Sequence, residues 1–311
     1  MKLGFVFPGQ GCQWVGMGKD LFTRFPEARA VFDAADDALG EKLSQLCFEG
    51  PEETLKLTAN TQPAVLTTSI AAWAVFAKRA PVPLYAAGHS LGEYSALVAT
   101  GSLSLGSAVR AVRDRGRLMQ EAVPAGVGAM AAVLGLPADQ VGQVCVRLAQ
   151  GRVLSPANYN SPEQTVIAGH ADAVQGATQP MIDAGAKRVI PLQVSAPFHC
   201  ALMDPVKPLL REVLQRATFA PPRSPVVTNV EARPNADANR TLTLLLEQVS
   251  RPVRWVECVE EMRRQGVTHF IELGPGKVLR GLIKQISKDT PVFGIEDAQS
   301  LDRALAGMGG G

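Results

Sequence analysis

The stretch LYAAGHSLGEYSALVAT, from Leu84 to Thr100, constrains the fold of this chain more than any other part of its sequence. A short apolar run leads into the turn Gly88-His89-Ser90-Leu91-Gly92, and a helical pattern follows. Two glycines around a serine let the backbone turn sharply between a buried strand and a helix, with the serine at the apex. This nucleophile-elbow pattern predicts an α/β domain in which the Ser90 hydroxyl faces a pocket.

A second interpretation of this turn stays open. The glycines can simply form a strand–helix turn, with Ser90 as the helix cap. If Ser90 is instead a nucleophile, the backbone N–H of Leu91 is available to stabilise an oxyanion, and the helix dipole favours negative charge at the same place. The nucleophile hypothesis also requires a base within reach of Ser90.

The rest of the chain alternates short apolar runs with helical patterns, which is typical of a parallel sheet covered by helices. We expect strands at KLGFVF, PLYAAG, SPVVTNV, THFIELG and TPVFGI. We expect helices at QPAVLTTSIAAWAVFAKRA, LGEYSALVATG, DPVKPLLREVLQRAT, VRWVECVEEMRRQG and GKVLRGLIKQIS. The C-terminal GMGGG is expected to be flexible.

A different order of elements interrupts this pattern. Apolar runs at GAMAAVLGL, VLSPANYN, TVIAG and RVIPLQV predict strands, with helices at PADQVGQVCVRLAQG and ADAVQGATQPMIDAGA. Pro180 should kink or interrupt the second helix. The order βαββαβ is that of a ferredoxin-like module. We therefore predict an α/β-hydrolase-like parallel-sheet domain from residues 1–126 and 198–311, with an inserted ferredoxin-like βαββαβ subdomain at residues 127–197.

Composition excludes several classes of function. Lys and Arg number 31 and Asp and Glu 29, so the net charge of +2 provides no field that would select nucleic acid or a membrane surface. The five cysteines form no CxxC pair, which favours free thiols over disulfides or a metal site. No signal-peptide segment or membrane-spanning run is recognisable, so we expect a cytoplasmic protein, and a monomer.

His199 is the best candidate for the base among the four histidines. It lies in VSAPFHCALMDP, where the predicted subdomain returns to the main domain, and such junctions often hold ligand pockets. His89 adjoins Ser90, and neighbouring side chains point apart at a sharp turn, so a structural or pocket-lining role is expected. His170 and His269 fit surface, cap or sheet-edge positions.

The sequence offers no obvious third member of a catalytic triad. An α/β-hydrolase supplies an acid between the serine and the histidine in chain order. The acids between Ser90 and His199, Glu93 among them, fall mostly in predicted helices or in the predicted subdomain. A dyad whose imidazole is oriented by a backbone carbonyl fits this pattern better than a triad.

Seven motifs occur in order along nearly the whole chain: FPGQGCQWVGMG, GHSLGEYSAL, RGRLMQEA, PANYNSPEQTVIAG, SAPFHCALM, RPVRWVECV and ELGPGKVL. Together they resemble the malonyl-CoA:acyl carrier protein transacylases of fatty acid synthesis, and the acyltransferase domains of polyketide synthases share them. The resemblance implies ping-pong transfer of malonyl from coenzyme A to the phosphopantetheine thiol of acyl carrier protein. It implies no cofactor, because the coenzyme A thioester is a substrate.

The resemblance also implies roles for individual residues. Ser90 matches the nucleophile, and His199 matches its base. Gln10, in PGQG, matches the residue whose backbone N–H joins that of Leu91 in the oxyanion hole. Gln248, in EQVSRPVRW, matches the position whose backbone carbonyl orients the histidine.

Arg115, in RDRGRLMQ, matches the arginine that holds the free carboxylate of malonyl. A planar guanidinium binds a carboxylate through two charge-assisted hydrogen bonds. An acetyl group would leave that buried charge unpaired, at a cost of about 3–5 kcal/mol. The alternative is a solvated basic helix face formed by Arg110, Arg113, Arg115 and Arg117, which we accept for Arg113 and Arg117.

Further substrate-binding residues follow from the same resemblance. Phe198 matches a position that helps the polyketide relatives select malonyl over methylmalonyl, because a bulky ring leaves little room for an α-methyl branch. Asn158 and Asn160 match a segment near the pocket, although they can also form a turn beside Pro162. The predicted substrate-binding set is Arg115, Phe198, Asn158, Asn160, His89 and Met119.

Two further expectations concern a cysteine and the carrier. Cys12 stands where the family often has serine, near the expected oxyanion loop, and we do not expect it to be a nucleophile. Acyl carrier proteins are acidic, so a modest positive patch would suffice to bind one. The candidates for that patch are Lys187, Arg188, Arg280, Lys284 and Lys288, each of which can equally be a solvated surface residue.

Three alternative functions stay open. A serine thioesterase or another hydrolase shares the elbow, because water and a carrier thiol attack the same acyl-enzyme. A polyketide-type acyltransferase would use another acyl-CoA. A non-catalytic protein with the same fold is disfavoured by the presence of Ser90, His199 and Gln10 together.

Overall fold

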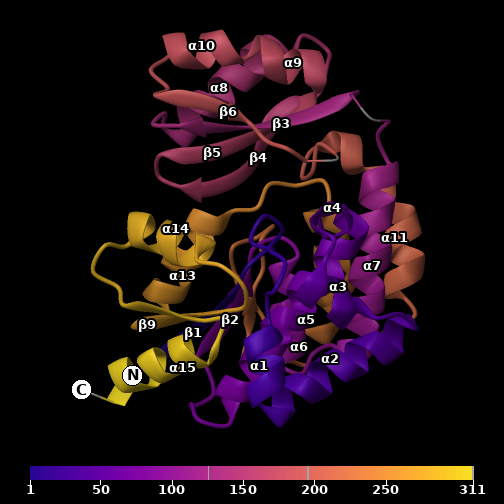
Figure 1. Ribbon diagram of the computed structural model, residues 1–311. Helices are drawn as coiled ribbons and strands as arrows, with labels where there is room; N and C mark the ends of the chain where they lie inside the picture. Colours follow the sequence, from indigo (N-terminus) through magenta and orange to yellow (C-terminus); the bar gives the residue numbers. More distant parts are fainter. Residues whose placement is uncertain (125, 195, 310–311) are drawn as a thin grey trace.

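The computed structural model describes residues 1–124, 126–194 and 196–309. It contains two sheets, which form two parts of the molecule stacked one above the other (Figure 1). The larger sheet has the strand order β10-β9-β1-β2-β7-β8, and the smaller has the order β4-β5-β3-β6. This arrangement confirms the predicted α/β fold with a second, smaller sheet.

The larger sheet is parallel except at one edge. Its parallel strands are β1 (Leu3–Phe7), β2 (Tyr85–Gly88), β7 (Val226–Val227), β9 (His269–Leu273) and β10 (Val292–Ile295). Strand β8 (Pro234–Asn235) pairs antiparallel with β7. The run SPVVTNV forms only a two-residue strand. Beyond it, the Asn229 side chain accepts a hydrogen bond from the Ser90 N–H and donates one to the Gly88 carbonyl.

Helices cover both faces of this sheet, as parallel sheets require. Phe5 and Phe7 of β1 belong to one apolar core, with α5 (Thr58–Ala77) and α7 (Leu105–Glu121). Val6 between them belongs to a second core, with α13 (Trp255–Arg264) and α14 (Val278–Ile286). The alternation places successive β1 side chains on opposite faces, as expected for a strand.

Helix α5 begins earlier in the chain than predicted, and it packs against α7, the helix that contains Arg115. It begins at Thr58 rather than near Gln62, and Pro63 lies inside it. Gly116 of α7 packs directly against its first residues, since a Cβ at position 116 would lie 2.6 Å from the carbonyl oxygen of Thr58. A glycine is therefore needed for α7 to approach α5 closely, and this contact brings Arg115 to the centre of the molecule.

The remaining helices of the larger part lie around these layers. They are α1 (Lys19–Arg24), α2 (Pro26–Leu39), α3 (Leu43–Glu49), α4 (Glu52–Lys56), α6 (Gly92–Ala99), α11 (Val206–Leu214), α12 (Ala238–Gln248) and α15 (Ala298–Gly309), with a 3₁₀ turn at Ala201–Met203. Helices α1 to α4 and α12 were not among the predicted elements. Helix α15 was not predicted either, and it contains residues 307–309 of the GMGGG run that was expected to be flexible. A Cβ at Gly307 would lie 2.5 Å from the Phe293 ring, and residues 310–311 lie outside the described part.

The smaller part has the predicted βαββαβ order. Its elements are β3 (Gly128–Leu134), α8 (Ala138–Ala149), β4 (Leu154–Ser161), β5 (Gln164–His170), α9 (Ala171–Gly176), α10 (Thr178–Asp183) and β6 (Arg188–Pro191). All three strand pairings are antiparallel. The second helix is interrupted at Ala177, because Pro180 has no N–H to donate to the carbonyl of residue 176. The division of the chain into domains at residues 127 and 197 stays a prediction.

Backbone hydrogen bonds join the two parts beside the site. Asn158 of β4 forms a parallel bridge with Val253, which precedes α13. The N–H of Val253 donates to the carbonyl of Ala157 at 2.9 Å, and the N–H of Tyr159 donates back to Val253 at 2.9 Å. These bonds fix the edge of the smaller sheet over the elbow. In the described residues, no helix is both long and apolar enough to cross a bilayer.

Candidate active site

Ser90 lies at the apex of a tight turn between β2 and α6. Its φ of 52° is left-handed, an unusual conformation for a residue with a side chain. The turn admits only glycine on either side, because a Cβ at Gly88 would lie 1.8 Å from Gly92 and one at Gly92 would lie 2.1 Å from the carbonyl oxygen of Phe7. The Ser90 N–H donates to Asn229 Oδ1 at 2.7 Å. Ser90 is therefore held by its neighbours in a strained conformation that presents its hydroxyl to the pocket.

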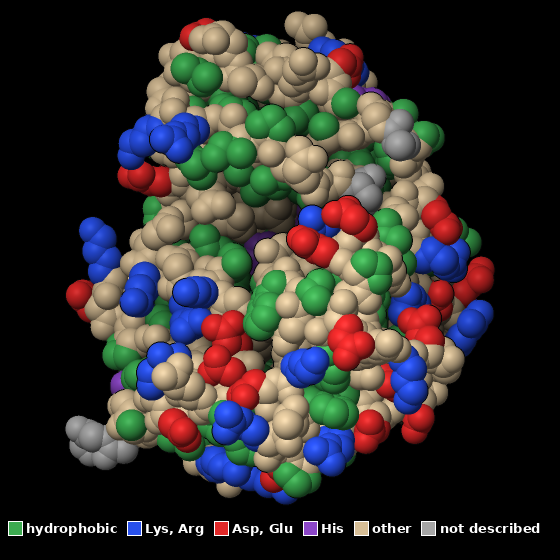
Figure 2. Space-filling view, viewed as in Figure 1, with side chains coloured by type: hydrophobic (Ala, Val, Ile, Leu, Met, Phe, Trp, Pro, Cys, Tyr) green, Lys and Arg blue, Asp and Glu red, His purple; other side chains and the backbone are tan. Residues whose placement is uncertain are grey.

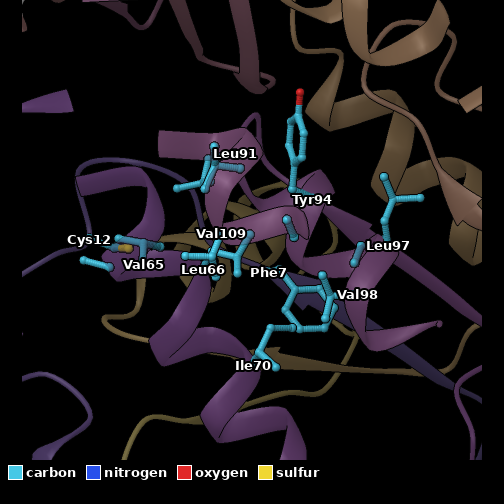
Figure 3. Close-up of a cluster of buried hydrophobic side chains, with 14 of the residues drawn as sticks. Phe7, Cys12, Val65, Leu66, Ile70, Leu91, Tyr94, Leu97, Val98 and Val109 are labelled. Carbon is cyan, nitrogen blue, oxygen red and sulfur yellow. The ribbon is translucent and has the colours of Figure 1, made fainter. Parts of the chain in front are cut away.

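Apolar packing supports this turn from below. Figure 3 shows Leu91, Tyr94 and Leu97, from the turn and α6, above Val65, Leu66 and Ile70 of α5, with the Tyr94 hydroxyl pointing away from the cluster. Leu91 is 1% exposed and Tyr94 is fully buried. The turn at Ser90 therefore packs on the apolar core of the larger part.

His199 makes a hydrogen bond through each ring nitrogen. Nε2 lies 2.7 Å from Ser90 Oγ, and Nδ1 lies 2.8 Å from the backbone carbonyl oxygen of Gln248. A carbonyl oxygen can only accept, so the proton of the neutral ring is on Nδ1, and Nε2 accepts from the serine hydroxyl. No acid side chain of the described residues hydrogen-bonds the imidazole, in agreement with the expected dyad geometry.

The imidazole is neutral in the free protein. Burial, and secondly the positive charge of Arg115, lower the pKa of His199 to about 3. Above that pH the ring carries no charge, so Nε2 can take a proton from Ser90. The arrangement can therefore generate a serine nucleophile at neutral pH.

Arg115 lies beside this pair and is only 1% exposed. Its Nη2 donates to Ser90 Oγ at 3.1 Å and to Gln248 Oε1 at 2.9 Å, and its Nη1 donates to Gln62 Oε1 at 2.8 Å. All of these partners are neutral, and no ion pair among the described residues includes Arg115. Burial lowers the pKa of Arg115. A buried cation without a carboxylate partner is costly, and it makes this site suited to an anionic ligand.

The other arginines of α7 lie outside the site. Arg117 is half-exposed and pairs with Asp114 and Glu121, as predicted for a solvated face. Arg113 is more enclosed than predicted, because its guanidinium is held by Glu41 and by the side chain of Asn60. Only Arg115 points into the pocket.

Two backbone amides near Ser90 have no acceptor. The N–H groups of Gln10 and Leu91 donate to no group among the described residues, and both residues line the pocket. The loop that carries Gln10 runs close to the elbow, since a Cβ at Gly9 would lie 2.5 Å from the carbonyl oxygen of His89. Two such N–H groups, that of Leu91 at the start of α6 and that of Gln10 in the loop after β1, can stabilise an oxyanion.

Cys12 follows this loop but is not a competing nucleophile. Its Sγ is buried and donates to the carbonyl of Gly9 at 3.0 Å. Burial, together with the negative charge of Glu272, raises the pKa of the Cys12 thiol well above its ordinary value. The thiol therefore stays protonated.

A cavity of about 120 Å³ encloses these groups. It lies between the two parts of the molecule, where Figure 2 shows a hollow with a histidine surface at its base. Its lining includes the predicted residues Gln10, His89, Ser90, Leu91, Arg115, Met119, Asn158, Phe198 and His199. Sequence reasoning missed four further lining residues, Gln62, Met130, Leu192 and Val194.

Asn160 does not line the cavity, contrary to the prediction. Its Oδ1 lies 2.8 Å from His89 Nε2, so it holds that ring from behind. The resemblance placed both residues near the pocket, but the pairing of β4 shifts register between Tyr159 and Ser161, which breaks the regular alternation of side chains there. Asn158 alone faces the pocket.

Glu93 and Asn229 were missed as members of this site. Glu93 Oε2 accepts from the Asn229 N–H at 3.0 Å and from Gln248 Nε2 at 2.8 Å, and Asn229 Nδ2 donates to the carbonyl of Gly88 at 2.7 Å. Asn229 follows a parallel strand at its carboxyl end, which is where sites form in such sheets, so its position was a usable signal. Glu93 directly follows the second glycine of the elbow.

The basic surface residues predicted to bind the carrier differ in whether acidic side chains already pair with them. Lys187 pairs with Glu163 at 3.0 Å, and Arg280 is largely enclosed by Glu272 and Glu296. Arg188, Lys284 and Lys288 are exposed. Arg280 is therefore a poor candidate for a docking residue.

Comparison with known proteins gives a consistent set of matches. Residues 4–304 match the acyl transferase domain family. The malonyl CoA-acyl carrier protein transacylase of Bacillus subtilis strain 168 is 47% identical over 305 residues, covering 98% of this chain and 96% of that protein. The corresponding protein of Escherichia coli strain K12 is 45% identical, with 98% and 99% coverage.

Solved structures agree with these matches. An acyl carrier protein S-malonyltransferase from Vibrio cholerae superposes with a TM-score of 0.95 at 46% identity, covering 98% of this chain and 100% of that one. A malonyl-transacylase solved in complex with a type II PKS acyl-carrier protein gives 0.96 at 46% identity, with 99% and 100% coverage.

Proposed function

The chain belongs to the acyl transferase domain family, and we propose that it transfers malonyl from coenzyme A to the thiol of an acyl carrier protein in fatty acid synthesis, through an ester on Ser90. Coenzyme A enters as part of the substrate. The observation that carries the proposal is Arg115, a buried guanidinium that forms no ion pair with any described residue and lies 3.1 Å from Ser90 Oγ. Malonyl is a small acyl group that ends in a free carboxylate, so it supplies the missing anion.

The first half-reaction loads Ser90. His199 Nε2 takes the hydroxyl proton while Oγ attacks the thioester carbonyl of malonyl-CoA. The N–H groups of Leu91 and Gln10 donate to the oxyanion that forms. When the C–S bond breaks, the Nε2 proton passes to the departing thiolate, which leaves the free thiol of coenzyme A and a malonyl ester on Ser90.

The second half-reaction reverses these roles with a new thiol. The phosphopantetheine thiol of the carrier gives its proton to His199 Nε2 and attacks the ester carbonyl. The same two N–H groups stabilise the oxyanion, and the proton returns to Ser90 Oγ as the ester bond breaks. The Nδ1 bond to the Gln248 carbonyl keeps the ring in the orientation that both steps need.

Arg115 selects the acyl group in this scheme. A bidentate pair with the malonyl carboxylate would replace its hydrogen bond to Ser90 Oγ and so free the hydroxyl for attack. The cavity of about 120 Å³ is far smaller than the roughly 300 Å³ or more of pockets that enclose a drug-sized ligand. Only the acyl end of the thioester fits inside it, and the ring of Phe198 limits the space for an α-methyl branch.

Intact-mass measurement after brief mixing tests the proposal directly. Malonyl-CoA should give one malonyl adduct on the wild type and none on Ser90→Ala, and holo-carrier protein should discharge it. The surface variant Ser107→Ala is the matched control and should label normally. An adduct that disappears equally fast without carrier protein would identify a hydrolase instead, and the absence of any adduct would refute the transferase.

A further inference from the structure

Glu93 is a buried carboxyl that the reaction scheme above does not use. It lies in the first turn of α6, three residues after Ser90, and is 2% exposed. Burial raises its pKa to about 7, although Arg115 and two hydrogen bonds act in the opposite direction. A buried carboxyl this close to the nucleophile is costly to keep, so a function for it has to be sought in its contacts.

Those contacts converge on the side chain of Gln248. The Gln248 Nε2 donates to Glu93 Oε2 at 2.8 Å, to the Ser90 carbonyl at 3.0 Å and to Asn229 Oδ1 at 3.3 Å, all of which are acceptors. On the other side, Gln248 Oε1 accepts from Arg115 Nη2 at 2.9 Å. A rotation of this amide by 180° would bring Oε1 against three oxygens and Nε2 against the guanidinium, so only one orientation satisfies every group.

We propose that Glu93 is a positioning residue that acts through Gln248 on Arg115 and thereby sets the preference of the pocket for an acyl group with a free carboxylate. The proposal rests on the transferase function and adds a determinant of its specificity. Glu93 is the partner closest to Gln248 Nε2, and it is the only one of the three acceptors that is a side chain able to carry charge. Its Oε2 also accepts from the backbone N–H of Asn229, which holds the carboxyl group in place.

The acceptor, rather than the charge, is the feature that matters in this proposal. Both hydrogen bonds reach Oε2, so a glutamine at position 93 can present an amide oxygen to the same two donors. A methionine has similar length and no comparable acceptor. Gln248 Nε2 would then keep only the Ser90 carbonyl and the more distant Asn229 Oδ1, so the orientation of the amide would be less firmly fixed. The Arg115 guanidinium would then lose the firm hydrogen bond from Nη2 to Gln248 Oε1 that orients it. The hydrogen bond of His199 Nδ1 would persist, because its acceptor is the backbone carbonyl of Gln248.

The test compares malonyl-CoA and acetyl-CoA in the loading half-reaction, measured by rapid quench and intact mass. Glu93→Met should raise the half-saturating concentration of malonyl-CoA about tenfold, the effect expected when a hydrogen bond to a charged group is lost. Its rate with acetyl-CoA should stay within about twofold of the wild type, because acetyl makes no use of Arg115. Glu93→Gln should restore the wild-type ratio between the two substrates.

Glu272 provides a matched control. Its carboxyl group is fully buried, its pKa is also raised to about 7, and it accepts from the N–H groups of Leu279 and Arg280 rather than from any residue lining the pocket. Glu272→Met should lower stability without changing the malonyl-to-acetyl ratio. If Glu93→Met fails to fold, Glu93→Asp withdraws the acceptor by one methylene while keeping the charge, and it should lower the ratio in the same way.

Three results would overturn the proposal. Equal losses with both substrates would reduce Glu93 to a structural residue, and an unchanged ratio in a folded Glu93→Met protein would do the same. A glutamine variant that behaves like the methionine variant would show that charge, and not the acceptor, sets the ratio. Failure of the transferase function itself would appear separately, as a wild type that forms no malonyl adduct.

Discussion

Arg115 Nη2 donates to Ser90 Oγ at 3.1 Å, so the buried cation of the pocket contacts the Ser90 hydroxyl directly in the free protein. The two residues come from different helical elements, α7 and the turn before α6, and their approach depends on the close packing of Gly116 against α5. Binding and chemistry therefore share one buried group. A change at Arg115 should consequently alter which acyl group is loaded.

Arg115→Ala should reverse the acyl preference. Loading from malonyl-CoA should fall by about 100-fold or more, because a buried charge pair worth about 3–5 kcal/mol is not formed. Loading from acetyl-CoA should rise. Rapid-quench mass spectrometry with each thioester measures both rates, and Arg117→Ala on the outer face of the same helix is the control. Equal losses with both substrates would assign Arg115 a structural role.

His199→Ala should slow loading of Ser90 by about 10³-fold or more, since the hydroxyl loses its proton acceptor. The variant His269→Ala, at the start of β9, changes a histidine far from the cavity and should load at the normal rate. Stopped-flow release of coenzyme A gives the rate constants. Near-normal loading by the His199 variant would exclude this residue as the base.

The rate of Ser90 loading should show no fall near pH 6.5, the ordinary pKa of a histidine. Because burial and Arg115 lower the pKa of His199 to about 3, the imidazole stays neutral at every pH well above that value. The value of kcat/KM for malonyl-CoA should therefore be nearly flat from about pH 5 to 8. A fall in kcat/KM centred near the ordinary histidine pKa would contradict this assignment.

The same pKa shift predicts how stability changes with pH. Below its ordinary pKa of 6.5, His199 binds a proton in the unfolded chain but not in the folded one, so its contribution to stability falls as the pH drops from 6.5 toward 3. The slope is at most about 1.4 kcal/mol per pH unit for one proton. Urea unfolding of the wild type and of His199→Gln between these limits should show a smaller slope for the variant. Identical slopes would mean that the folded-state pKa is not lowered.

Gly92→Ala should destabilise the protein by about 2 kcal/mol or more, because the added methyl group would lie 2.1 Å from the carbonyl oxygen of Phe7. Gly142, inside α8, is the matched control, since a Cβ there meets nothing within 4 Å. Gly142→Ala should stabilise the helix by up to about 1 kcal/mol. Urea midpoints measure both changes, and a tolerated Gly92→Ala would contradict the tight elbow.

Local sequence was sufficient to predict the turn at Ser90 and the order of elements in the smaller part. The elbow follows from two glycines around Ser90, and the order of the smaller part follows from apolar runs and from Pro180. The role expected for the Leu91 N–H followed from the elbow pattern, whereas those for Gln10, Gln248 and Arg115 came from motif resemblance. A backbone carbonyl or N–H leaves no mark in residue type, and spacing alone did not single out Arg115. Asn160 was expected in the pocket from the same resemblance, but the pairing of β4 shifts register beside it, and its side chain contacts the His89 ring instead.

Only the tertiary structure decided which polar side chains surround Ser90 and Arg115. Gln62, Glu93 and Asn229 lie on three separate elements, and their side chains meet Arg115, Gln248 and Ser90 only after the helices and the sheet have packed. Helical spacing could not separate Arg115 from Arg113, because the charge of a residue does not say which face of a helix is buried. The sequence by itself therefore determined the fold class and the turn that presents Ser90, whereas packing decided the burial, the hydrogen bonds and the charge balance around the Ser90 hydroxyl.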